Sequence, residues 1–217
     1  MDYIKLAEIY EALEKTTKRL EKTYILSQFM KEIKKTSEIE PIINLLRGSP
    51  FPSWDERKIG VSDKLIIKAL ALSAGTSKEK IEKLWLKTGD LGETAFELIE
   101  HKKQTTLQSK TLTIIDVYKN LRALAELEGS GTVSKKVGLI AELLTSASAL
   151  EAKFITRTVL EDLRTGVGDS TIRDSIVWHF WFDKLKLQYE RKTNELIIKE
   201  DVEQEYDKYS EKIQASY

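Results

Sequence analysis

The segment Gly60-Val61-Ser62-Asp63-Lys64-Leu65-Ile66 has a near copy 106 residues later, Gly166-Val167-Gly168-Asp169-Ser170-Thr171-Ile172. In each copy a glycine and a short polar stretch precede an apolar position, a pattern typical of a loop that leads into a helix. Tyr10 has a counterpart in Tyr118 at the similar offset of 108. A nearly constant offset indicates a duplicated unit whose loops have drifted. The alternative is a coincidence between two common capping patterns.

Helix start and stop signals recur along the chain and predict an all-α fold. In a capping box the side-chain oxygen of a Ser, Thr or Asp accepts the N3 amide, and a Glu at N3 reaches back. The candidate boxes are Ser37–Glu40, Thr76–Glu79, Asp90–Glu93 and Ser148–Glu151. Glycines expected in the left-handed conformation after a helix are Gly48, Gly75, Gly89, Gly129 and Gly166. The predicted helices are 2–22, 24–35, 38–47, 63–74, 77–88, 91–101, 113–128, 134–146, 149–164, 171–184 and 200–213. No run alternates convincingly with the period of a strand.

These signals predict a compact multi-helix domain over residues 1–182, built from two pseudo-symmetric halves. The halves are roughly 1–108 and 109–182, and each is expected to contain a helix, a polar turn, two helices, a loop and a further helix. No Gly-, Ser- or Pro-rich linker divides them, so we expect one shared core. Residues 183–217 are expected to form a diverged helical extension.

Composition excludes several classes of protein. The 217 residues include 35 Lys+Arg and 35 Asp+Glu, so the chain is not a uniformly basic nucleic-acid binder, although a basic face is allowed. Residues 15–35 carry a net charge of +5, whereas 183–217 carry −2. The absence of cysteine excludes disulfides, thiol catalysis and zinc fingers. The sequence shows neither a signal-peptide core nor a membrane-spanning apolar run, which indicates an intracellular setting in the cytoplasm or nucleoid.

Three stretches are candidates for function. In 129–136, small residues precede a helix whose first turn holds two lysines, and amides and lysines there attract phosphate. The spacing is not that of a P-loop, and a glycine C-cap followed by a hydroxyl N-cap is the alternative. Residues 164–171 follow the same pattern, and 60–62 are their counterpart. The third is the basic stretch 15–35, which could equally be a solvated helix face.

No catalytic constellation accompanies these stretches. The two histidines, His101 and His179, lack the spacing of metal ligands, and the carboxylates are scattered over helix faces. The four tryptophans could stack on bases, but their helical spacing favours core packing. Binding is therefore a better interpretation of this segment than catalysis.

Five ordered segments together resemble the N-terminal DNA-binding domain of ATP-dependent DNA ligases, in particular the archaeal replicative ligases. The resemblance runs from about Tyr3 to about Phe182. The segments that carry it are Phe51–Val61, Gly89–Ala95, Gly129–Lys136, Leu150–Phe154 and Leu163–Gly168.

The resemblance implies an all-α domain that lies on the minor groove and holds backbone phosphates on both sides of a nick in duplex DNA. It implies that Gly131, Thr132, Lys135 and Lys136 form one phosphate-binding turn. It implies that Arg164, Gly166, Gly168 and Ser170 form the other, with Gly60 and Ser62 as its counterpart. Arg19 is a further DNA contact that the resemblance implies less strongly. Replication, repair and recombination are the processes that such ligases serve.

Departures from the family limit this expectation. The sequence contains no Lys-x-Asp-Gly motif, on which these ligases self-adenylate, and no OB-fold domain. We therefore expect the segment to bind DNA without joining it, with ATP and Mg²⁺ used by the full-length protein beside its adenylation and OB-fold domains. Gln104-Thr105-Thr106-Leu107-Gln108 occupies the place of a sliding-clamp box but lacks both aromatics. Gln104 and Leu107 are candidate clamp contacts. The alternative function is a helical protein-interaction scaffold without DNA binding.

Overall fold

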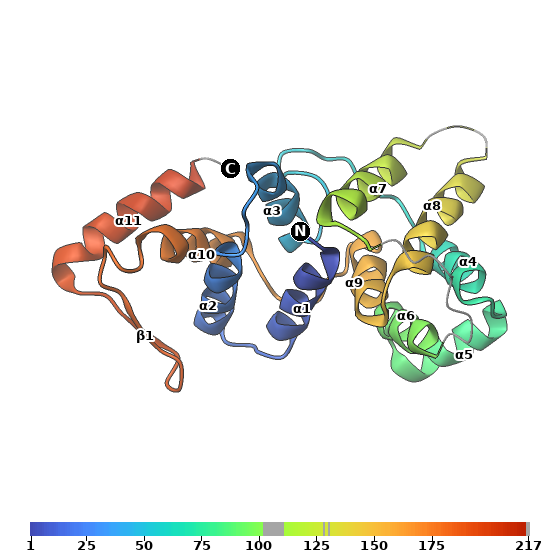
Figure 1. Cartoon of the computed structure of the whole chain (residues 1–217), viewed down its shortest axis with the longest axis horizontal. Coiled ribbons are helices and arrows are strands. Elements are labelled where there is room, and N and C mark those ends of the chain that lie inside the picture. Colours follow the sequence, from blue (N-terminus) through green and yellow to red (C-terminus); the bar gives the residue numbers. More distant parts are fainter. Residues whose placement is uncertain (102–110, 128, 130, 216–217) are drawn as a thin grey trace. The chain divides into compact units, whose positions relative to one another are not determined.

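The computed structural model describes residues 1–101, 111–127, 129 and 131–215, and this part of the chain is predominantly helical (Figure 1). The prediction of an all-α fold is confirmed. The elements are α1 (Tyr3–Glu14), α2 (Arg19–Met30), the 3₁₀ helix η1 (Thr36–Glu38), α3 (Ile39–Leu46), α4 (Asp63–Ala74), α5 (Lys78–Thr88), α6 (Leu91–Glu100), α7 (Ile114–Glu126), α8 (Thr132–Ser146), α9 (Ala149–Val159), α10 (Asp169–Trp181), β1 (Gln188–Glu190), β2 (Glu195–Ile197) and α11 (Glu200–Gln214).

The single helix predicted over 2–22 is wrong, because the chain leaves the helix after Glu14 and re-enters one at Arg19. The hydroxyl of Thr16 accepts a hydrogen bond from the Lys18 amide at 3.1 Å and donates one to Glu21 at 2.7 Å. Such local bonds offer the backbone an alternative to helical pairing. The antiparallel hairpin β1–β2 was also not predicted, since three-residue strands are too short for an alternating pattern to register.

Most of the predicted helix signals are confirmed. Ser148 and Glu151 form a reciprocal capping box, and the Asp90 carboxylate accepts the amides of Gly92 and Glu93. The start of α5 differs by one residue, since Ser77 rather than Thr76 is the N-cap. Ser37 caps no α-helix and lies inside η1. The five glycines predicted as stop signals, Gly48, Gly75, Gly89, Gly129 and Gly166, all have positive φ, between 60° and 84°.

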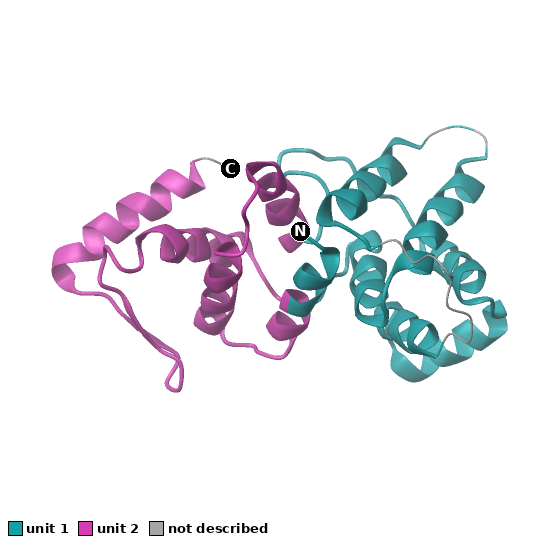
Figure 2. Cartoon of the chain, in the orientation of Figure 1, with its two compact units in different colours: residues 1–8, 48–164 teal, residues 9–47, 165–217 magenta. Residues whose placement is uncertain are grey.

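The chain forms two compact units that are discontinuous in sequence (Figure 2). Unit 1 comprises Met1–Glu8 and Gly48–Arg164, and unit 2 comprises Ile9–Arg47 and Thr165–Tyr217. In unit 1, α4 packs on α8 and α6 packs on α9. In unit 2, α2 packs on α10. Each unit therefore draws helices from both of the sequence halves that the internal repeat suggests.

The segment after residue 182 belongs to unit 2. Its apolar residues Leu185 and Leu187 form a buried cluster with Val177 and Trp178 of α10. The rings of Trp181 and Tyr209 stack with their centroids 4.2 Å apart, which joins α10 to α11. This segment is thus packed against the helices that precede it.

The tryptophans divide between the core and the surface. Trp178 is 2% exposed, in agreement with the expected core packing, but Trp54 is 74% exposed. Core packing is therefore wrong for Trp54, which lies in the irregular segment before α4. None of the described helices is long and apolar enough to cross a membrane.

Candidate nucleic-acid interface

Two loops, residues 59–62 and 165–168, lead into α4 and α10 and match one another position by position. Each begins with a buried residue, Ile59 or Thr165. An exposed glycine follows, Gly60 with φ +63° or Gly166 with φ +60°. The third position is half-buried and the fourth is exposed in both loops. The repeat predicted from the sequence is therefore a repeat of backbone conformation at these two places.

A buried lysine lies beneath the 59–62 loop. Helix α8 packs on α4 (Figure 1), and this packing turns Lys136 inward until it is 9% exposed. Its Nζ donates to the carbonyl oxygen of Ile59 at 2.7 Å and to that of Gly60 at 3.1 Å. The ammonium thus ties two consecutive carbonyl groups of the loop to α8.

A second buried lysine lies beneath the 165–168 loop in the same way. Lys22 of α2 is 7% exposed, and its Nζ donates to the carbonyl oxygens of Thr165 at 2.6 Å and of Gly166 at 3.3 Å. Burial lowers the pKa of this ammonium below its ordinary value. The carbonyls held by Lys22 lie 106 residues after those held by Lys136, so the two contacts are equivalent by the offset of the repeat.

These contacts decide where the loop amides point. In a trans peptide the C=O and the next N–H point in opposite directions, and the described chain has no cis peptide. Because two carbonyls of each loop face the lysine, the amides of Gly60, Val61, Gly166 and Val167 face away from it. These four amides donate to no acceptor among the described residues. Each loop therefore presents consecutive free N–H groups in front of a helix N-terminus.

The helices that follow these loops lack the side-chain caps that four other helices have. Side chains cap α5, α6, α7 and α9 through Ser77, Asp90, Thr113 and Ser148. No side chain caps α4 or α10, nor α8 or α2, which carry the two buried lysines. Helices α3 and α11 also lack a side-chain cap. The amides at the start of α4 and α10 consequently keep their capacity to bind an anion.

The start of α8 belongs to the predicted stretch 129–136 and contacts the 59–62 loop through Lys136. Gly131 has φ +77°, and the Thr132 hydroxyl donates to the carbonyl oxygen of Gly129. Lys135 is exposed. Lys136 was predicted to lie beside Lys135 as an exposed phosphate ligand, and its burial corrects that expectation. Lys135 and Lys136 are consecutive, and one step along an α-helix turns the side-chain direction by about 100°. That turn takes the side chain from solvent into the interior.

Arg164 is held by two carboxylates of unit 1. Its Nη1 lies 2.8 Å from Asp90 Oδ2 and its Nε lies 2.7 Å from Asp162 Oδ2, while 46% of its side chain is exposed. Arg164 and Ser62 line one pocket of about 410 Å³. Arg164 therefore lies near the 59–62 loop and presents part of its guanidinium to solvent, but both carboxylates compete for it.

Asp90 also pairs with the buried Arg157, whose Nη2 lies 2.9 Å from Asp90 Oδ2. Burial alone would raise the pKa of the Asp90 carboxyl. The hydrogen bond and charge of Arg157, with the amide of Glu93 and the charge of Arg164, bring that pKa below its ordinary value. Asp90 is therefore a carboxylate that anchors two arginines at the start of α6.

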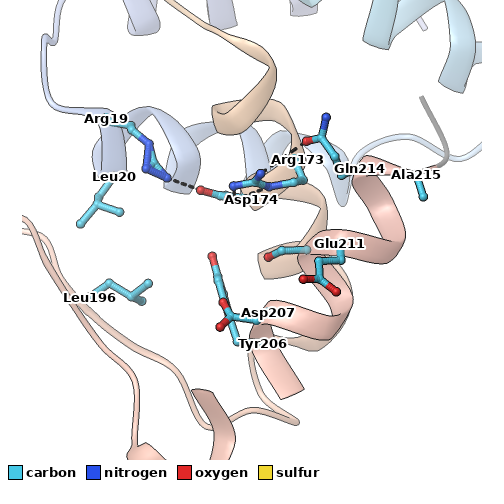
Figure 3. Close-up of a pocket in the computed structure, with 11 residues that line it drawn as sticks. Arg19, Leu20, Arg173, Asp174, Leu196, Tyr206, Asp207, Glu211, Gln214 and Ala215 are labelled. Carbon is cyan, nitrogen blue, oxygen red and sulfur yellow. Dashed lines mark hydrogen bonds and ion pairs between the residues drawn. The ribbon is translucent and has the colours of Figure 1, made fainter. Parts of the chain in front are cut away.

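Arg19 lies in unit 2, at the start of α2, and is paired with the buried Asp174 of α10. Figure 3 shows Arg19 and Arg173 approaching Asp174 from two sides in a pocket of about 670 Å³. Two carboxylates of α11, Asp207 and Glu211, line the same pocket. Its charge is therefore mixed, which makes Arg19 a weaker candidate for an anion than the loop amides.

The remaining predicted residues divide between described and undescribed parts. Gly168 is the N-cap of α10, and Ser170 is exposed in the first turn of that helix. Gln104 and Leu107 lie outside the described residues. Sequence reasoning missed Lys22, which it counted only as one charge of the basic stretch. The sequence feature that could have pointed to Lys22 is its position near the start of a helix, which it shares with Lys136 of α8.

This geometry defines a class of protein. It is a predominantly helical module in which two equivalent loops, each supported by a buried lysine, lead into helix N-termini. The family described as "DNA ligase N terminus" matches residues 2–177, and the chain belongs to this family. It is 43% identical over 184 residues to a DNA ligase of Methanobrevibacter smithii, which covers 85% of the chain and 33% of that ligase. It is 44% identical over 182 residues to a DNA ligase of Methanothermobacter thermautotrophicus, covering 83% of the chain and 32% of the relative. A DNA ligase of Archaeoglobus fulgidus is 35% identical over 183 residues, or 84% of the chain and 33% of that ligase. The chain thus spans about a third of the length of these relatives.

Proposed function

We propose that this chain is the DNA-binding domain of an ATP-dependent DNA ligase and that it binds nicked duplex DNA without reading its sequence. The observation that carries the proposal is the pair of equivalent loops with outward-facing amides at 59–62 and 165–168. Membership of the family and the similarity to archaeal DNA ligases support it.

Backbone phosphate is the ligand that suits this arrangement. Free amides at a helix N-terminus bind anions, and contacts to phosphates carry no information about base sequence. On unit 1 the interface comprises Gly60, Ser62, Gly131, Thr132, Lys135 and Arg164. On unit 2 it comprises Gly166, Gly168 and Ser170, with Arg19 as a peripheral contact. Two such sites suit a ligand with many equivalent phosphates, and contacts on both sides of a nick in the minor groove follow from the family resemblance.

A gel-shift titration with nicked duplex at several salt concentrations tests the proposal. Roughly five to eight neutralised phosphates should give a log–log salt slope of about −4 to −7. Scrambled duplexes of equal length should bind within a factor of about three, because phosphate contacts only position the protein. A flat salt response, or strong preference for one sequence, would contradict the proposal and favour a helical protein-interaction scaffold.

Nick sealing belongs, in this proposal, to the full-length protein and to the two thirds of the relatives that this chain does not cover. ATP and Mg²⁺ enter only there, together with the adenylation and OB-fold domains. Within the described residues, no group of three or more His, Asp or Glu side chains could hold a metal ion. A sliding clamp remains a candidate partner through Gln104 and Leu107.

A further inference from the structure

Lys22 and Lys136 share a feature that a purely structural lysine does not need: neither has a carboxylate partner among the described residues. Buried ammonium groups are normally paired, because an isolated charge in the interior is costly. Here the chain buries one unpaired ammonium in each unit, at equivalent places, with only carbonyl oxygens as acceptors. Among the described residues, each charge is therefore solvated by carbonyl oxygens but is not neutralised by a carboxylate.

The glycines allow each ammonium to lie against the backbone of its loop. A Cβ placed on Gly166 would lie 2.7 Å from Lys22 Nζ, and one on Gly60 would lie 3.3 Å from Lys136 Nζ. Each ammonium therefore occupies the space that a side chain at this exposed position would fill, so the glycine lets the lysine approach the loop backbone. On the outer side of the same glycine are the free amides of the loop. An anion bound by those amides would lie one peptide layer above the ammonium.

We infer that Lys22 and Lys136 are positioning residues for phosphate binding, each of which fixes the carbonyls of one loop inward and places a positive charge beneath its outward amides. The inference rests on the proposed function and extends it to two residues that do not themselves touch DNA. It assigns the unpaired buried charge a purpose, since a positive charge behind the loop favours an anion at the outward amides without contacting it. A shared role of this kind also accounts for the equivalence of the carbonyls that the two lysines contact, although the lysines lie on different helices, α2 and α8.

Lys22→Met and Lys136→Met test this role, because methionine keeps an unbranched side chain and removes the charge. Each variant should bind nicked duplex about tenfold more weakly, the scale of a lost charge-assisted contact. Its log–log salt slope should stay within about half a unit of wild type, since no direct phosphate contact is removed. Lys83→Met in α5 and Lys208→Met in α11 are matched controls, both exposed and outside the interface, and should bind like wild type.

Ethylation interference on the nicked duplex gives a readout that a merely structural lysine would not change. Lys22→Met should lose interference at one set of phosphates and Lys136→Met at the other, while each keeps the set that its partner loses. A general folding defect would instead lower the active fraction and weaken both sets together. Circular dichroism melting of each variant identifies that case.

If a methionine variant does not fold, the wild-type protein still supplies a test. The side-chain ¹⁵N resonances of Lys22 and Lys136 should shift when nicked duplex is added, whereas that of Lys208 should not. Wild-type protein that fails to bind DNA would defeat the proposed function itself. Wild-type protein that binds, with folded methionine variants of unchanged affinity or with unshifted lysine resonances, would overturn only the positioning role.

Discussion

At the scale of the residue, neighbouring lysines have opposite tasks. Lys135 is exposed at the start of α8, whereas Lys136 is buried against the carbonyls of Ile59 and Gly60. Only Lys135 can contact a phosphate directly, so the two single variants should behave differently from one another.

Lys135→Ala should weaken binding to nicked duplex by about 1 kcal/mol and flatten the log–log salt slope by about one unit, because one direct phosphate contact is lost. Its unfolding free energy should change by no more than a few tenths of a kcal/mol, as for other exposed charges. Parallel gel shifts and urea titrations measure both quantities. Lys208→Ala in α11 is the control, and an equal loss of affinity there would show that the contacts are diffuse.

Asp90 and Glu93 both pair with the buried Arg157, so Asp90→Asn should lower the unfolding free energy by about 2 kcal/mol at neutral pH, the scale of a lost hydrogen bond to a charged group. The pKa of Asp90 is depressed below the ordinary value of 3.8. Its stabilisation is therefore complete above that value and is lost as the pH falls through the lower folded-state pKa. Urea titrations of wild type and Asp90→Asn from pH 7 downward should show that the difference between their unfolding free energies disappears below about pH 4. A difference that is constant with pH would contradict this assignment.

At the scale of the element, the helix N-termini are of two kinds. Those of α5, α6, α7 and α9 are closed by side chains, whereas those of α4 and α10 are left open behind their glycine loops. A closed N-terminus contributes to stability, and an open one can bind an anion. Serine is the N-cap residue of the open helix α4 and of the closed helix α9, which permits a matched comparison.

Ser148→Ala should destabilise the protein by about 1 kcal/mol through the loss of the capping box of α9 and should leave DNA affinity unchanged. Ser62→Ala should leave the stability unchanged and weaken DNA binding, because Ser62 makes no capping hydrogen bond and lies in the proposed interface. Thermal unfolding and gel shifts on the two variants distinguish the outcomes. Loss of stability in Ser62→Ala would indicate that its hydroxyl does cap α4 in solution.

At the scale of the whole molecule, the compact units and the repeat halves divide the chain differently. Helix α2 belongs to the first half and packs on α10 of the second, and α4 of the first half packs on α8 of the second. Some apolar helix faces of each half are therefore buried against the other half, although α4, α5 and α6 of the first half also pack on one another. We therefore expect both halves to be required for either unit to form.

Fragments 1–108 and 109–217 should each lack a cooperative unfolding transition and should recover one when they are mixed. The reason is that α2 and α4 lose their packing partners in the first fragment, as α8 and α10 do in the second. Circular dichroism melts of each fragment and of the equimolar mixture measure this. A cooperative melt of fragment 1–108 alone would show that it contains a core of its own.

The chain by itself, supplied with ATP and Mg²⁺, should form no covalent adenylate and seal no nick, because the sequence lacks a Lys-x-Asp-Gly motif. Incubation with radiolabelled ATP followed by denaturing electrophoresis tests for the adduct. A longer protein that includes the adenylation domain is the positive control. A stable adduct on this chain would place an acceptor lysine where the sequence shows none.

The sequence by itself determined the features that depend on neighbouring residues. The capping box at Ser148, the left-handed glycines and the offset between Gly60 and Gly166 were all readable, because φ preferences and cap hydrogen bonds act over a few residues. For the same reason the two glycine loops could be picked out as candidate anion sites. The lengths of these two loops and the offset between them could be predicted without knowing how the helices pack.

Only the tertiary structure decided which cations the site uses and how. Lys22 meets carbonyls 143 and 144 residues away, a separation at which no sequence pattern specifies a contact. Whether Lys135 or Lys136 turns inward depends on the face that α8 presents to α4, and adjacent residues differ there by about 100°. Arg164 likewise meets Asp90 only after the chain has folded. Packing of helices from opposite halves placed these charges, and local preferences could not.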